Sequence, residues 1–172
     1  MNRLLVAASL LGFVLTAAVS SAQHPAMPPG MSHEAHLAQM QKDAAMKKRG
    51  AAAMGFDQDA AAHHFRLYAD GGAIEVEAKL PADNPTRSAI RSHLREIAEQ
   101  FSAGDFTKPF ETHGETPPGV ADLVRLRESM TYRYQETPAG GRVRITTTNR
   151  EALSAVHAFL TYQIREHGTK NP

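Results

Sequence analysis

Apolar and polar residues alternate in the middle of the chain and predict a β-hairpin. In residues 73–80, AIEVEAKL, apolar side chains fall at every second position and charged side chains lie between them. The preceding run, residues 63–69, HHFRLYA, is separated from it by Asp70, Gly71 and Gly72, which are typical of tight hairpin turns. One face of this hairpin is expected to be core and the other solvated, as in an antiparallel sheet.

After this hairpin, apolar residues recur every three to four positions, which predicts a helix. Asp83 or Asn84 can cap its start and Pro85 can open it, while the sequence AGD ends it. Its apolar stripe is Ile90, Leu94, Ile97 and Phe101.

The same order of elements then returns. Residues 130–149 predict a second hairpin, turning at Gly140 and Gly141, and Asn149 caps a second helix with the stripe Leu153, Val156, Leu160 and Ile164. The joining segment, residues 106–129, is expected to hold a short extended piece and a helix opened near Pro117 and Pro118. We therefore predict an α+β fold in which duplicated strand-strand-helix units form a four-stranded antiparallel sheet with helices on one face.

The N-terminal region differs in pattern from this domain. Residues 1–22 have the basic start, apolar middle and small-residue end of a cleaved signal peptide, and their apolar run falls short of the roughly 20 residues of a membrane span. Residues 23–54 lack a sustained apolar stripe, although their middle could form a weak helix around Leu37 to Met46. We therefore expect a flexible tail containing His and Met, followed by a single domain over residues 55–168.

Composition narrows the function classes. The chain has no cysteine, which excludes disulfides, and a net charge of +1, which gives no basic surface for nucleic acid. We expect no membrane span after signal cleavage, and a periplasmic or extracellular location. The sequence contains no G-x-S-x-G elbow, phosphate-binding loop or dinucleotide fingerprint.

Histidines are the main candidates for chemistry. His93 and His157 lie within or beside the two helical stripes, at similar distances from their helix starts, so the duplicated fold is expected to bring them together near the centre of the sheet. His113 lies in an expected loop, ETHGETPPG, and could join them in binding copper or zinc. The structural alternative is that His93 and His157 are interior residues hydrogen-bonded to the backbone or to each other.

Three other histidines rank lower. His63 and His64 point to opposite faces of one strand and therefore cannot chelate one ion together. His63 points inward but lies about 12 Å from the expected centre, which makes it a weaker metal ligand. His167, which follows the second helix, is expected to be solvated.

Motifs spread over residues 54–167 resemble a family of small, uncharacterised secreted bacterial proteins. They include MGFDQDAAAHHF, HGETPPGV and ALSAVHAFLTYQIREH. Members of that family are sometimes labelled aspartate carbamoyltransferase, but this chain is short for such a catalytic subunit and has no phosphate-binding loop. The resemblance implies one continuous domain and no particular site.

The sequence leaves three functions open. The first is an exported binding or accessory protein that takes copper or zinc through His93, His157, His113 and His63, with the His and Met of the tail as a low-affinity collector. The second is an enzyme with a site in the His113 loop, where Glu115 lies nearby. The third is a partner-binding module that uses the charged outer face of the sheet.

Overall fold

The computed structural model describes residues 27–169, so the expected signal peptide lies outside the described residues. The elements in chain order are α1 (His33–Met54), the 3₁₀ turn η1 (Gln58–Ala60), β1 (Ala61–Tyr68), β2 (Gly71–Ala78), α2 (Asn84–Ala103), α3 (Thr107–His113), α4 (Val120–Arg125), the 3₁₀ turn η2 (Arg127–Ser129), β3 (Met130–Glu136), β4 (Gly140–Thr147) and α5 (Arg150–Glu166).

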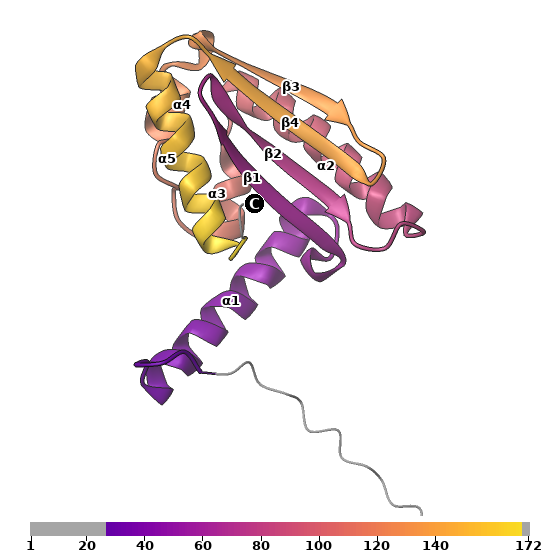
Figure 1. Cartoon of the computed structure of the whole chain (residues 1–172), viewed down its shortest axis with the longest axis vertical. Coiled ribbons are helices and arrows are strands. Elements are labelled where there is room, and N and C mark those ends of the chain that lie inside the picture. The colour runs from indigo at the N-terminus through magenta and orange to yellow at the C-terminus, as the bar shows by residue number, and fades with distance from the viewer. Residues whose placement is uncertain (1–26, 170–172) are drawn as a thin grey trace, which may run out of the picture.

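The four strands form one antiparallel sheet in the order β1-β2-β4-β3, which confirms the predicted α+β fold. The two hairpins meet along β2 and β4, and each is followed by a long helix (Figure 1). Helix α2 lies mainly against β3 and β4, whereas α5 lies mainly against β1 and β2. Each helix therefore covers the hairpin of the other unit, which ties the two halves into one core.

The predicted stripe of α2 forms the centre of that core. Ile90, Leu94, Ile97 and Phe101 are all buried, as are Val156 and Leu160 of α5. The predicted caps also form: the Asp83 carboxylate accepts a hydrogen bond from the Thr86 N–H at 3.0 Å, and the Asn149 side chain accepts from the first turn of α5. Local sequence signals therefore place both long helices correctly.

The glycine pairs have a different role from the one predicted. Gly71, Gly72, Gly140 and Gly141 lie within strands β2 and β4, and the turns are made by the residues before them. A Cβ atom on Gly140 would lie 2.1 Å from the backbone oxygen of Val76 on the neighbouring strand. Glycine at this position allows the close approach of β2 and β4.

Helix α1 occupies most of the segment expected to be a flexible tail. Ser32 caps its first turn by accepting a hydrogen bond from the Ala35 N–H, and Gly55 ends it in the left-handed conformation. Only Met46 and Gly50 are buried along its length. The weak apolar pattern does not exclude a helix, and α1 extends beyond the weak helix that the sequence allows around Leu37 to Met46.

Polar groups hold α1 to the domain. The Arg49 guanidinium donates hydrogen bonds to the backbone oxygens of Thr112 and His113 at the end of α3, both at 3.1 Å. The Lys108 ammonium returns a hydrogen bond to the Ala53 oxygen at 3.0 Å. Cations at the last carbonyls of a helix are favourable, and such contacts leave no trace in an apolar periodicity.

The segment between the hairpins contains one further departure from prediction. Its first part is the helix α3 rather than an extended piece, and His113 is the last residue of that helix rather than a loop residue. The helix α4 follows the prolines, as predicted. Among the described residues, no helix combines the length and apolar character needed to cross a membrane.

Candidate functional site

A cavity of about 60 Å³ lies between the sheet and the helices, beneath the end of α1, and four histidines line it. They come from four separate elements or their ends, namely His63 of β1, His93 of α2, His113 of α3 and His167 after α5. Met54, at the end of α1, lines the same cavity, together with apolar residues of the core. The structure thus brings together three of the four predicted ligands and adds one that was expected to be solvated.

Three of the imidazole rings are direct neighbours. The ring centroids of His63 and His167 are 5.1 Å apart, with their planes nearly parallel at 24°. The centroids of His113 and His167 are 5.4 Å apart, with their planes almost perpendicular at 89°. His167 therefore lies between the other two.

His93 of α2 lines the same cavity. The Phe56 ring packs against both His63 and His93, with centroid distances of 6.2 Å and 5.8 Å. His93 is only 8% exposed, and its Nδ1 has no hydrogen-bond partner among the described residues. It is thus a buried part of the cavity wall.

A glutamine fixes the orientation of His113. Its Nε2 lies 2.9 Å from Oε1 of Gln163, so with the amide oxygen as acceptor this nitrogen carries the proton and donates. The lone pair is then on Nδ1, which is buried and finds no partner in the described part of the chain. Nε2 of His63 is likewise buried without a partner there. Buried polar nitrogens are normally hydrogen-bonded, so unpartnered ones mark a site that can accept a ligand.

Burial keeps these imidazoles uncharged at neutral pH. It lowers the pKa of His63 and of His93 to about 4, and that of His167 to about 3. The neighbouring imidazoles lower the pKa of His167 further. Burial also lowers the pKa of His113, although the hydrogen bond that His113 donates to Gln163 and the nearby carboxylates oppose that change. Neutral imidazole is the form that binds metal ions.

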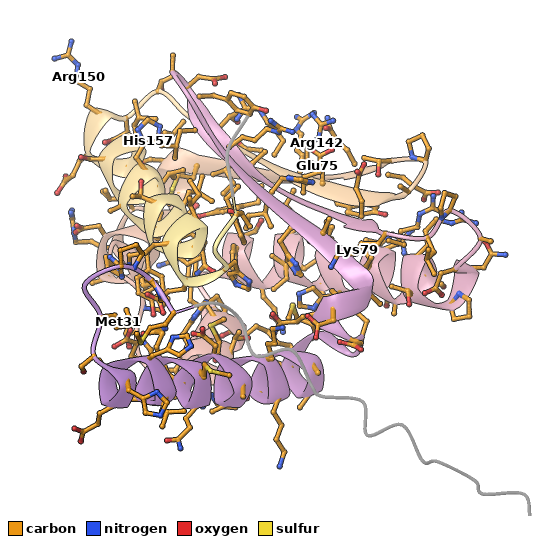
Figure 2. The ribbon with its side chains drawn as sticks, turned by 60° about the horizontal axis from the view of Figure 1, so that its bottom comes forward. Met31, Glu75, Lys79, Arg142, Arg150 and His157 are labelled. Carbon is orange, nitrogen blue, oxygen red and sulfur yellow. The ribbon has the colours of Figure 1, made fainter. Side chains whose placement is uncertain are left out.

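The predicted meeting of His93 and His157 does not occur. Nε2 of His157 lies 3.0 Å from the backbone oxygens of both Tyr68 and Gly71, at the turn between β1 and β2. His93 instead lies beside Phe56 and His63, near the start of β1. The two histidines are therefore near opposite ends of one strand, and His157 (labelled in Figure 2) holds α5 to the hairpin turn rather than lining the cavity.

The residues that the sequence analysis missed share one helical face. Phe159, Gln163 and His167 follow one another at intervals of four residues on α5 and its end, and all three line the cavity. This spacing was visible in the sequence. Gln163 and His167 continue the face of α5 that begins with the apolar Phe159. Their spacing is the signal that indicates an inward position for His167.

A second, larger hollow adjoins the cavity. This groove has a volume of about 720 Å³ and lies between α1, the start of β1 and the residues after α5. His63 and His167 line both the groove and the cavity. Its walls are polar, with lysines, carboxylates and His64 around it.

The outer face of the sheet carries ion pairs. The carboxylate of Glu75 lies 3.5 Å from the Arg66 guanidinium and 3.8 Å from that of Arg142, and Figure 2 shows Glu75 and Arg142 side by side. Arg144 lies over the ring of Tyr68, 4.6 Å from its centroid. Much of the charge on this face is thus satisfied within the molecule.

Within residues 27–169, no group of three or more His, Asp or Glu side chains stands in an arrangement that already fits a metal ion. The rings of the cavity are close, but their free nitrogens do not converge on one point. Comparison with protein-family models, curated proteins and solved structures gave no match.

Proposed function

We propose that the protein binds a single copper or zinc ion in the histidine cavity and serves as a binding or accessory protein rather than an enzyme. One observation carries this proposal: four uncharged imidazoles line one small cavity, and His63, His93 and His113 each have a buried nitrogen without a partner among the described residues. In keeping with the signal-like residues 1–22, we place this activity in the periplasm or outside the cell.

The spacing of the rings supports this assignment. Two imidazoles bound to one tetrahedral ion, with metal–nitrogen distances of roughly 2 Å, have ring centroids roughly 5 Å apart. The separations of His167 from His63 and His113, 5.1 Å and 5.4 Å, are of this size. Convergence of the nitrogens therefore requires ring rotation and no large movement of the backbone.

The contacts that hold His113 in place also favour its role as a metal ligand. Histidine ligands usually donate their other ring N–H to an oxygen, which fixes the tautomer and the ring orientation. The Gln163 amide oxygen does this for His113, while Arg49 holds the backbone oxygen of the same residue. His113 is thus restrained at both its ring and its main chain.

Met54 favours copper over zinc. Met54 lines the cavity with the four histidines. A mixed imidazole and thioether set suits Cu(I), whereas zinc in proteins takes thiolate, imidazole or carboxylate ligands. We therefore expect Cu(I) to bind more tightly than Zn²⁺, and replacement of Met54 by leucine to weaken Cu(I) selectively.

An enzyme centred on His113 is less well supported. His113 is only 8% exposed at the end of α3, and its ring is hydrogen-bonded to Gln163. The nearby Glu115 accepts a hydrogen bond from the Tyr162 hydroxyl at 2.7 Å and so already has a partner. Neither group is arranged as a free acid or base facing a substrate.

Metal analysis of protein purified without a histidine tag tests the proposal. The protein is stripped with a chelator, equilibrated with Cu(I) or Zn²⁺, freed of unbound ion and analysed by mass spectrometry. We expect one ion per chain, lost in the double variant His63→Gln/His113→Gln and retained in the matched variant His33→Gln/His36→Gln, whose histidines lie on α1 outside the cavity. Absence of bound ion in the parent protein, or equal loss in both variants, would overturn the proposal.

A further inference from the structure

The cavity and the groove meet at two histidines. His63 and His167 contribute to the walls of both hollows, and no other residue within 27–169 lines both of them. The cavity, at about 60 Å³, has room for an ion and a few water molecules, whereas the groove, at about 720 Å³, can hold an ion with its full hydration shell. An ion therefore loses part of that shell between the two.

Tightly packed side chains form part of the remaining cavity wall. Leu94, Ile97, Phe101 and Phe159 are each at most 5% exposed. On the side of α3, the Lys108 ammonium is hydrogen-bonded to the Ala53 oxygen and lies 3.5 Å from the Glu96 carboxylate. These contacts hold the Lys108 side chain in place beside the cavity.

Among the described residues, packing rather than hydrogen bonding holds the His167 ring in place. Its ring stacks on His63 and packs against Phe65 and His113, but it makes no side-chain hydrogen bond within the described part of the chain. It follows the last turn of α5, and Gly168 comes next with a positive φ of 58°. The ring can therefore rotate without breaking a hydrogen bond.

The charged groups of the groove would let a metal ion pass through rather than bind it tightly. The Asp59 carboxylate is paired with Lys47 at 2.7 Å, and the Glu166 carboxylate is paired with Lys42 at 3.4 Å. Carboxylates that are already paired attract a cation weakly. An ion in the groove therefore finds its better ligands at the floor, where the imidazoles are.

Building on the proposed function, we propose that the groove is the passage through which the metal ion enters and leaves the cavity, and that rotation of the His167 ring opens and closes this passage. Rotation of this ring opens the way past His63 and presents an imidazole nitrogen to the incoming ion. In this role His167 controls the rates of binding and release, and the other imidazoles supply the rest of the binding energy.

The absence of cysteine from the chain provides a direct test. A single cysteine is introduced at a groove position, Asp43→Cys, or at the matched position Gln41→Cys, which is exposed on the same helix outside the groove. Each variant is coupled to a bulky maleimide. Stopped-flow measurements then follow the association of Zn²⁺ and its release to an excess of chelator.

A blocked passage slows both directions equally. For the label at residue 43, we expect association and release each to slow by about tenfold while Kd changes by less than about twofold. The label at residue 41 should leave both rates unchanged. Unchanged rates with the groove label, or equal slowing with both labels, would overturn the passage while leaving metal binding intact. Failure of the unlabelled protein to bind Zn²⁺ or Cu(I) at all would overturn the proposed function itself.

Discussion

Lowering the pH from about 7.5 to about 5.5 will destabilise the metal-free protein through the histidines of the cavity. Burial holds the pKa of His63 and of His93 at about 4 in the folded state, against 6.5 for an exposed histidine. The unfolded chain therefore takes up protons as the pH falls below about 6.5, whereas the folded chain does not. Stability is fully present above the unfolded pKa and is lost as the pH falls from there toward the folded pKa.

The size of the loss follows from these pKa values. A pH of about 5.5 lies one unit below the pKa of a histidine in the unfolded chain. For each histidine that stays neutral in the folded state, the free energy of unfolding is therefore lower by about 1.4 kcal/mol. His63 and His93 together contribute about 2 to 3 kcal/mol once the partial exposure of His63 is allowed for. This is a large share of the roughly 5 to 15 kcal/mol that stabilises a typical domain.

Denaturation by urea at the two pH values measures this effect. The wild type is compared with His63→Gln/His93→Gln, which removes two of the four cavity imidazoles, and with His33→Gln/His36→Gln, which removes two histidines of α1 outside the cavity. We expect the wild type and the α1 variant to lose at least about 2 kcal/mol more between the two pH values than the cavity variant. An equal loss in all three proteins would refute the claim that the cavity holds its imidazoles neutral.

Further predictions concern contacts away from the cavity. Arg49→Ala removes two hydrogen bonds to the end of α3. Hydrogen exchange along α1 should therefore become faster, and the free energy of unfolding should fall by about 1 kcal/mol. Unchanged protection of α1 from exchange would contradict its docking on the domain. Gly140→Ala places a Cβ against the oxygen of Val76, and we expect a loss of about 2 kcal/mol or more in thermal unfolding, whereas an unchanged Tm would argue against the register of β2 and β4. His157→Ala breaks contacts with two backbone oxygens at the hairpin turn, so the free energy of unfolding in urea should fall by about 1 to 2 kcal/mol. His64→Ala should leave that free energy nearly unchanged. Equal effects of the two substitutions would contradict the placement of His157.

The fold was largely predictable because its signals are local and apolar. Alternation in β2 and the stripe of α2 each specify a buried face, and Asp83 and Asn149 mark the helix starts. Helix α1 was not predictable in this way. Its attachment depends on Arg49 meeting the carbonyls of a helix 63 residues away, and a polar contact over that separation has no periodicity in the sequence.

The site was predictable only in part. Strand alternation correctly directs His63 inward, and the stripe of α2 correctly buries His93. The position of His157 depends on how the two units cross, since each helix covers the other hairpin, and similar distances along two helices do not decide whether their side chains meet. His167 was readable from its spacing to Gln163 but was discounted because it follows the helix.

X-ray absorption spectroscopy of the copper-loaded protein tests the central claim most directly, because it reports the atoms bound to the ion. We predict scattering from two or three imidazole rings and from one sulfur atom, with the sulfur lost in Met54→Leu and imidazole scattering reduced in His113→Gln. A spectrum with oxygen ligands and no imidazole scattering, or one unchanged by both substitutions, would contradict a metal site in the histidine cavity.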